Sequence, residues 1–359
     1  MIPYSISSDH HCHNWSAFSE TTEGGVNSRL STILKELTRQ ADELLERGGT
    51  MMFLAGDLFH VRGSVDPSVL NPVVETIRGI VDRGVQIHAI PGNHDLKSND
   101  TTELGNAIQV LSTIEGFTVV TRPTAVDVDD HVVFMVPWRA TLEALRESVN
   151  TIPAEQRRGA DLIIHAPING SLPVAFDNAL DPKEIGDIGW GFRRVFSGHF
   201  HNHACLGHGV FSIGATTQQT WRDIGSKAGF LIVDDEVTFR ASRAPSFIEI
   251  TEVDAADEDE LTLTVDGNYV RVRFESIKPA QEKELRQILM DKKAQGVVIQ
   301  AVRETATVAR AGASVSAGAS IETSVLDFVA MLDYEDKAAV TCLAEEVLIK
   351  TRESLARAD

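Results

Sequence analysis

Residues 51–60 read Met-Met-Phe-Leu-Ala-Gly-Asp-Leu-Phe-His, an apolar run that ends in an acid and an imidazole. The five apolar residues predict a short buried strand. Amphipathic helices are predicted on either side, over about 30–45 and 69–81, because apolar residues recur there at helical spacing. A further apolar run follows at 85–90. This alternation of strands and helices is typical of a parallel α/β sheet.

Polar motifs follow the apolar runs at five places along the chain. Besides Gly56-Asp57-Leu58-Phe59-His60, they are Asp9-His10-His11, Gly92-Asn93-His94-Asp95, a lone His165, and Gly198-His199-Phe200-His201. In open α/β sheets the loops after the carboxyl ends of the strands line one edge, where ligands bind. We therefore expect these motifs to meet, although they are far apart in sequence.

The motifs supply carboxylate, amide and imidazole groups, which hard or borderline divalent cations prefer over thiolates. Asp57 is the predicted bridging ligand, because it follows the small Gly56, which allows close approach. One bridging carboxylate lets two metals lie about 3.5–4 Å apart, the separation used in two-metal phosphate chemistry. The ligands that complete the two metal positions are expected to be Asp9, His11 and His201 for one, and Asn93, His165 and His199 for the other.

His94 is expected to act on the substrate rather than on a metal. It lies beside Asn93, and Asp95 follows it and is expected to orient its ring. An imidazole held in this way can protonate a leaving oxygen, while a metal-bound water of lowered pKa acts as the nucleophile. Each motif alone is more typical of a turn than of a site, so the prediction depends on all five occurring in this order.

Composition restricts the function further. The formal net charge of −19 repels nucleic acid at long range, which argues against a stand-alone DNA-binding protein. It does not argue against a nuclease, because bound dications add local positive charge and a partner can supply a basic groove. The chain has no apolar run of membrane-spanning length and no signal-peptide pattern, so we expect a cytoplasmic protein of a bacterium or of a phage-infected host.

The chain is long enough for one large domain and a smaller one. Acidic composition predicts a solvated linker, and an Ala/Gly/Ser-rich stretch predicts a flexible tether. The predicted units are an α/β domain over 1–251, an acidic linker over 252–261, a small α+β domain over 262–304, a tether over 305–320, and a helical segment over 321–359. The last segment contains two helices with narrow apolar stripes, which either dock on a partner or pack back on their own domain.

At this point the chain resembles the calcineurin-like metallophosphoesterase superfamily, and within it the nuclease subunits of SbcCD-type DNA-end processing complexes and their phage relatives. The motifs that carry the resemblance are Ala55–His60, Pro91–Asp95, Val136–Trp138, Gly198–His201, Phe211–Ala215 and Lys227–Phe230. The resemblance covers about residues 1–250 by motif and the remainder by layout only. In one departure, Cys12-His13-Asn14 stand where the family usually has a glycine soon after its first histidine ligand.

The resemblance implies a four-layer β-sandwich flanked by helices, with a small α+β capping domain and C-terminal helices. It implies two divalent ions, Mn²⁺ before others, held by Asp9, His11, Asp57, Asn93, His165, His199 and His201. It implies that His94 is the catalytic histidine and that His60 assists exonuclease action near the scissile phosphate. It further implies DNA as the substrate, a homodimer, and an SMC-like ATPase that docks on the C-terminal helices.

Two other functions remain open. A small-molecule phosphatase or cyclic-nucleotide phosphodiesterase on the same binuclear core fits the acidic charge, but such an enzyme does not need residues 262–359. A non-catalytic scaffold that recruits the ATPase predicts a damaged site, whereas the five motifs are intact.

Overall fold

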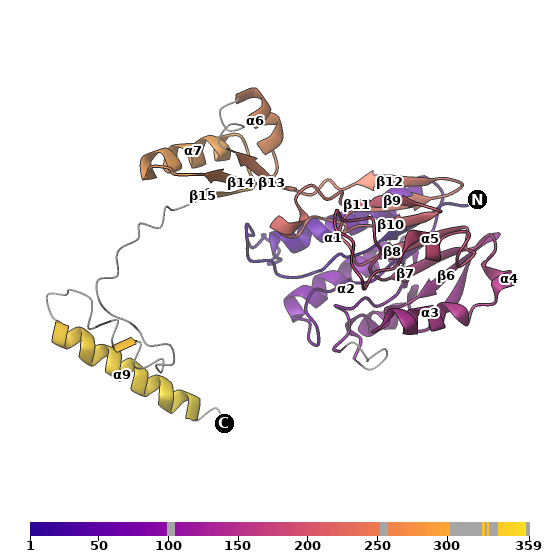
Figure 1. Cartoon of the computed structure of the whole chain (residues 1–359), viewed down its shortest axis with the longest axis horizontal. Coiled ribbons are helices and arrows are strands. Elements are labelled where there is room, and N and C mark those ends of the chain that lie inside the picture. The colour runs from indigo at the N-terminus through magenta and orange to yellow at the C-terminus, as the bar shows by residue number, and fades with distance from the viewer. Residues whose placement is uncertain (99–104, 252–257, 302–324, 327–328, 330–336, 357–359) are drawn as a thin grey trace. The chain divides into compact units, whose positions relative to one another are not determined.

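The computed structural model describes residues 1–98, 105–251, 258–301, 325–326, 329 and 337–356 (Figure 1). The chain divides into two units, Met1–Val302 and Arg303–Asp359, and each is described by itself. The first unit contains three β-sheets with their covering helices. The second contributes one helix, α9 (Lys337–Ala356), to the described residues.

The first sheet has six strands in the order β12-β11-β1-β2-β3-β4. Their bounds are β1 (Tyr4–Ser7), β2 (Met51–Leu54), β3 (Gln86–Ala89), β4 (Phe117–Val119), β11 (Gly229–Val233) and β12 (Val237–Ala241). Strands β1 to β4 run parallel to one another. Strand β11 pairs antiparallel with β1, and β12 pairs antiparallel with β11. A 3-10 helix, η1 (Ala107–Thr113), precedes β4.

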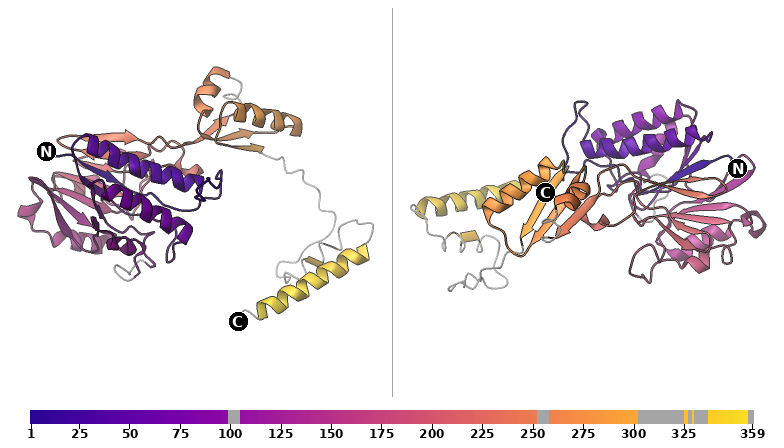
Figure 2. Two further views of the ribbon diagram at one scale, coloured as in Figure 1. Left: turned by 180° about the vertical axis from the view of Figure 1, so that it is seen from behind. Right: turned by 90° about the horizontal axis from the view of Figure 1, so that it is seen from above.

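Two helices cover the outer face of this sheet, α1 (Ser28–Glu46) and α2 (Pro67–Val81). Asn27 caps α1 by accepting hydrogen bonds from two backbone N–H groups, and Asp66 caps α2 by accepting one, from the Ser68 N–H, before the proline that starts the helix. Their apolar faces share a buried core with the outward side chains of β2 and β3. Figure 2 shows the two helices side by side, in indigo and violet.

The second sheet also has six strands, in the order β5-β6-β7-β8-β10-β9. Its strands are β5 (Thr124–Val128), β6 (His131–Val136), β7 (Asp161–His165), β8 (Arg194–Gly198), β9 (Ala204–Gly207) and β10 (Val210–Ser212), and its helices are α3 (Leu142–Asn150), α4 (Ala154–Arg157) and α5 (Pro182–Ile185). Strands β6, β7, β8 and β10 are parallel, with antiparallel strands at both edges. Residues of α3 and α5 pack against the outer face.

The two sheets pack face to face around a single apolar cluster. Ile6 and Phe53 from the first sheet meet Ile163 and Phe196 from the second, and all four are fully buried. At the edge of this layer Asp161 accepts hydrogen bonds from the Arg194 guanidinium at 2.7 and 2.9 Å. The arrangement is helix, sheet, sheet, helix, so the expected α/β fold with several sheets flanked by helices is confirmed.

A third sheet consists of parallel strands β13 (Phe247–Thr251), β14 (Tyr269–Phe274) and β15 (Gly296–Ala301). Together with α6 (Glu258–Val265) and α7 (Pro279–Asp291) it forms what we term the small domain. Its strands are all parallel and alternate with helices, which is an α/β arrangement rather than the α+β unit that the sequence suggested. Strand β13, placed by the sequence in the first domain, pairs with β14 instead. Part of the predicted acidic linker is helical, because Leu261 and Val265 lie one turn apart and are both buried in the small domain's core.

Helix α9 corresponds to the second predicted C-terminal helix. Its Leu343 and Ile349 side chains are 61% and 58% exposed. The predicted tether over 305–320, and most of the helix predicted before α9, lie outside the described residues. Within the described part of the chain, the helices are too short or too polar to cross a membrane.

Candidate metal centre

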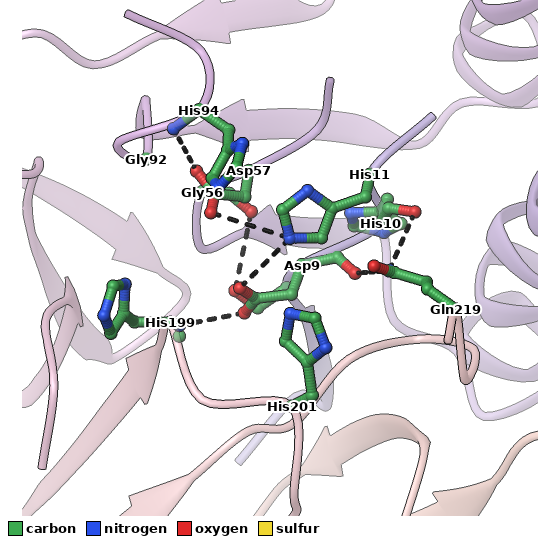
Figure 3. A network of polar contacts seen from close by, with 12 residues as sticks. Asp9, His10, His11, Gly56, Asp57, Gly92, His94, His199, His201 and Gln219 are labelled. Carbon is green, nitrogen blue, oxygen red and sulfur yellow. Dashed lines mark hydrogen bonds and ion pairs between the residues drawn. The ribbon is translucent and has the colours of Figure 1, made fainter. Parts of the chain in front are cut away.

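Each predicted ligand lies where a strand of the sandwich ends. Asp9 follows β1, Asp57 follows β2 and Asn93 follows β3, while His165 ends β7 and His199 follows β8. The backbone joins two of these loops, because the Asp9 and His11 N–H groups donate to the Gly56 and Asp57 carbonyls, both at 3.0 Å. Parallel strands bring the first three motifs to one edge of the first sheet and the last two to an edge of the second sheet. The motifs meet because the two sheets pack face to face, so the site lies at two neighbouring sheet edges and not at the single edge that the sequence suggested. Figure 3 shows Asp9, Asp57, His199 and His201 gathered there.

Asp57 lies at the middle of the group and is 1% exposed. Its Oδ2 atom is 3.4 Å from His165 Nε2 and 3.7 Å from His11 Nε2. Its Oδ1 atom accepts a hydrogen bond from the His94 backbone N–H at 2.8 Å. One carboxylate therefore faces imidazoles from both sheets, which is the position that a bridging ligand requires.

The other ligand candidates gather on two sides of Asp57. On one side Asn93 Oδ1 lies 3.2 Å from His165 Nε2 and 3.0 Å from His199 Nδ1. On the other side the ligand atoms of Asp9, His11 and His201 all lie within 4.8 Å of one another. The structure thus gathers the six side chains around Asp57, but the groups overlap, because the ligand atoms of Asp9, Asp57 and His165 also lie within 4.8 Å of one another. Their role as metal ligands stays a prediction.

The chemistry of this donor set fits a pair of divalent cations. Asp9 Oδ1 is buried and has no hydrogen-bond partner among the described residues, whereas its Oδ2 accepts from the His199 N–H at 2.9 Å. A buried carboxylate oxygen without a partner is costly unless a cation pairs with it. Two carboxylates, one carboxamide and four imidazoles are also the donors that borderline dications prefer.

Glycines allow the motifs to approach this closely. A Cβ atom on Gly56 would lie 2.3 Å from His165 Nδ1, and one on Gly92 would lie 2.2 Å from Asp57 Oδ1. Gly198 is enclosed in the same way, with a Cβ position 2.0 Å from Ser8 Oγ. No larger residue fits these three positions without moving a ligand candidate or its support.

Backbone strain is concentrated at the same place. The non-glycine residues with positive φ include four ligand candidates, Asp9 at 51°, His11 at 46°, Asp57 at 55° and His199 at 102°. Such left-handed conformations cost an L-residue roughly 1–2 kcal/mol each. They persist where the surrounding structure fixes them, and they cluster at functional sites.

The family is shown by a match that covers more than half of the chain. Residues 3–203 match the family model of the calcineurin-like phosphoesterases. The chain belongs to this family. The resemblance drawn from the motifs is thereby confirmed, and so is the expectation of a metal-dependent hydrolase of phosphate esters.

The phosphoesterase is 28% identical over 204 residues to exonuclease subunit 1 of Enterobacteria phage T4, which is 55% of this chain and 57% of that protein. The chain thus spans little more than half the length of this relative. Among solved structures it is similar to TT1561 of Thermus thermophilus, with a TM-score of 0.43 and 11% identity, over 67% of this chain and 99% of that one. It is also similar to the Pseudomonas putida nuclease MPE, with a TM-score of 0.26 and 15% identity, over 58% of this chain and 66% of that one.

Electrostatics at the phosphoesterase centre are dominated by burial and by Asp57. Burial opposes protonation of His165, but the Asp57 carboxylate outweighs it and raises the pKa of His165 to about 9. Burial, followed by the charge on His165, lowers the pKa of His199 to about 3. Burial also raises the pKa of Asp9 above its usual value. The centre therefore favours a positive charge next to Asp57, which the His165 proton or a cation can supply.

His94 lies beside the ligand candidates, but Asp95 does not orient its ring as the sequence suggested. The His94 Nδ1 atom lies 2.7 Å from the His60 carbonyl oxygen, to which it donates. The Asp95 carboxylate turns back into the core and accepts the backbone N–H groups of Gly92 and Phe59, both at 2.9 Å. The expected contact is wrong because the fully buried Asp95 ties two motif loops together instead.

The His60 ring packs against both the His11 and the His94 rings, which also contact each other at 4.7 Å between centroids. Its Nδ1 atom is 3.2 Å from His11 Nδ1, and its ring stacks on His94 at 5.4 Å between centroids and 13° between planes. Burial, followed by the neighbouring His94, lowers the pKa of His60 to about 4. His60 is therefore placed to contact whatever His94 contacts.

Cys12 is buried in the core under α1 and α2.

Sequence reasoning missed two residues that hold ligand candidates in place. Asp223 Oδ1 lies 2.8 Å from His201 Nδ1. The Gln219 side-chain amide donates to the Asp9 carbonyl at 2.8 Å (Figure 3). The available signal was the capping box between Thr220 and Asp223 around η2 (Trp221–Asp223), which marks a fixed turn but not its target.

Proposed function

We propose that this phosphoesterase is an Mn²⁺-dependent DNA exonuclease and endonuclease subunit. It hydrolyses phosphodiester bonds at DNA ends during recombination, repair or replication in the cytoplasm of a bacterium or phage-infected host. The observation that carries the proposal is the pair of ligand groups on either side of Asp57, with His94 next to them. The similarity to a phage protein named as an exonuclease subunit supports DNA as the substrate.

In this proposal Asp57, Asp9, His11 and His201 would hold one ion, and Asp57, Asn93, His165 and His199 would hold the other. The ions, when bound, supply an acidified water and neutralise charge on the phosphate. The His94 Nδ1–H group donates a hydrogen bond to the His60 carbonyl oxygen. The Nε2 atom of His94 is therefore left to exchange a proton with the leaving oxygen. The hydrogen bond from the His94 backbone N–H to Asp57 Oδ1 keeps His94 close to the carboxylate that would bridge the two ions.

A cavity beside the proposed centre suits a nucleobase. It has a volume of about 690 Å³, reaches His199, and is lined by Trp138, Arg139, Phe176 and Phe200 among others. Phe176 and Phe200 lie 5.7 Å apart between ring centroids, and Trp138 stacks on His199 at 5.4 Å. Aromatic faces suit unpaired bases, whereas the acidic Glu143 and Asp177, which also line the cavity, would repel a phosphate placed beside them. This cavity favours a nucleic-acid substrate over a phosphate ester without a base.

The proposal includes a partner. The small domain acts as a cap on the substrate, and α9 docks on an SMC-like ATPase through an apolar stripe that includes Leu343 and Val347, four positions apart on one face of the helix. The net charge of −19 supports the need for a partner that supplies a basic surface. We further propose that the assembly contains two copies of this chain. Co-purification with the ATPase tests the docking. The complex with the full-length chain should survive dilution, and the complex with Leu343→Asp should be weaker.

The competing proposal is a small-molecule phosphodiesterase on the same core, which the acidic charge favours. The two are separated by measuring, with Mn²⁺, the hydrolysis of linear double-stranded DNA, single-stranded circles and bis-p-nitrophenyl phosphate. The nuclease proposal expects DNA cleavage at a kcat/KM well above that for the small ester. It fails if both DNA substrates stay intact, with the partner present, while the small ester is hydrolysed.

A further inference from the structure

One short segment contacts both the proposed metal centre and the small domain. This segment, Gln218–Asp223, lies after β10 and includes η2. On its inner side Asp223 Oδ1 lies 2.8 Å from His201 Nδ1. From the same side the Gln219 amide donates to the Asp9 carbonyl at 2.8 Å. Asp9 and His201, two ligand candidates in the loops after β1 and β8, are therefore held by one turn.

The segment is rigid because the Asp223 carboxylate also closes it. Asp223 Oδ2 accepts the backbone N–H groups of Gln219 at 2.9 Å and Thr220 at 2.8 Å. The Asp223 and Gln219 residues are 5% and 2% exposed, so water competes little for these bonds. A carboxylate on one ring nitrogen of a metal-ligating histidine fixes its tautomer and directs the other nitrogen to the metal. Asp223 thereby fixes the direction of the His201 ring.

The outer side of the segment packs on the small domain. Trp221 meets Phe247 of β13 edge to face at 4.9 Å between ring centroids. The Arg271 guanidinium of β14 lies over the Trp221 ring at 4.6 Å. The Phe247 backbone N–H donates to Gln218 Oε1 at 2.6 Å. The small domain's first two strands therefore hold the same turn that holds the ligand candidates.

Arg29 on α1 provides a second connection to the turn. Its guanidinium donates to the Gln219 carbonyl at 2.6 Å. The same group lies over the rings of Phe247 at 5.3 Å and Tyr269 at 5.4 Å, both in the small domain. A shift of these strands would thus move Gln219 through its carbonyl as well as through Gln218.

We propose that Gln218–Asp223 is a positioning segment through which the small domain controls the metal position formed by Asp9, His11 and His201. Gln219 and Asp223 are positioning residues, and Trp221 connects them to the small domain. This inference rests on the proposed function, because it requires Asp9 and His201 to hold an ion. Its distinctive consequence is selectivity. Among the interactions described above, the position formed by Asn93, His165 and His199 meets the segment only indirectly, through the hydrogen bond from the His199 N–H to Asp9 Oδ2, so its affinity should change far less.

The test is Mn²⁺ binding to the full-length chain by calorimetry and electron paramagnetic resonance. In Asp223→Asn, which keeps the side-chain shape, one ion should bind about 10- to 100-fold more weakly while the other changes far less in affinity. Trp221→Ala, which touches no ligand candidate, should weaken the same ion. Trp190→Ala is the matched control, because Trp190 is also partly buried but packs against the far core of the second sheet.

The outcomes separate this inference from the proposed function. Wild-type protein that binds two ions, with both affinities unchanged in folded Asp223→Asn and Trp221→Ala, overturns the inference alone. Equal weakening of both ions, or weakening in Trp190→Ala as well, also overturns it, because general destabilisation then explains the loss. Wild-type protein that binds no Mn²⁺ overturns the proposed function and the inference with it.

Discussion

Replacing Gly92 by alanine perturbs the proposed centre with a single methyl group. The added Cβ atom would lie 2.2 Å from Asp57 Oδ1, 2.5 Å from Asp57 N and 2.8 Å from Asp57 Cγ. Ordinary contact begins near 3.4 Å, so the carboxylate oxygen has to move by more than 1 Å. The same oxygen accepts the His94 N–H at 2.8 Å, so His94 is displaced with it.

The size of the effect follows from this displacement. Overpacking a buried position by one methyl group costs about 1–3 kcal/mol of folding free energy, which a domain of this size tolerates. A misplacement of about 1 Å at a reacting centre lowers the rate roughly 100-fold. Gly92→Ala should therefore fold, lose about two orders of magnitude in kcat/KM, and bind Mn²⁺ more weakly.

The assay compares kcat/KM for bis-p-nitrophenyl phosphate, bound Mn²⁺ and urea unfolding with those of Gly79→Ala. Gly79 lies inside α2 and has no atom within 4 Å of its Cβ position. This control should gain about 0.4–1 kcal/mol of stability from reduced unfolded-state entropy and keep full activity. Wild-type kcat/KM and metal content in Gly92→Ala would refute the close approach of Gly92 to Asp57.

Three further predictions follow from the site and the core. His94→Ala should lower kcat by about 100- to 10,000-fold and leave the number of bound Mn²⁺ ions unchanged, as measured by calorimetry. Asp161→Asn should lower the free energy of unfolding by about 3–5 kcal/mol, since the buried Arg194 loses its partner. Burial opposes ionisation of Asp161, but hydrogen bonds from His131 and Arg194 outweigh burial and lower the pKa of Asp161. The difference in unfolding free energy between wild type and Asp161→Asn, measured with urea, should therefore shrink below about pH 4. Because the pKa of His165 is raised to about 9, its contribution to stability is complete below about pH 6.5, and metal-free protein should lose it as the pH rises through 9.

The layered fold and the meeting of the five motifs were predictable because both depend on local patterns. An apolar run followed by a polar loop fixes where a strand ends, and parallel strands bring their ends to one edge. Asp9 and Asp57 meet for this reason, whereas Asp57 and His165, 108 positions apart, meet only because their two sheets pack face to face. The partner of β13 was not predictable, because strand pairing is a long-range choice that the strand's own sequence does not encode.

The misread residues share a physical cause. The direction of the Asp95 side chain depends on the dihedral angles of its loop, and the sequence shows only that it follows His94. Asp223 and Gln219 act on residues more than 20 positions away, through a turn whose target appears only in the folded chain. The acidic residues before Leu261 obscured a helix whose buried face consists of only a few side chains.

The two-ion centre is tested most directly by the anomalous difference map of crystals grown with Mn²⁺. We expect two peaks about 3.5–4 Å apart, with Asp57 in contact with both, His11 and His201 beside one, and His165 and His199 beside the other. A single peak, or two peaks that do not share Asp57, would contradict the two-ion centre.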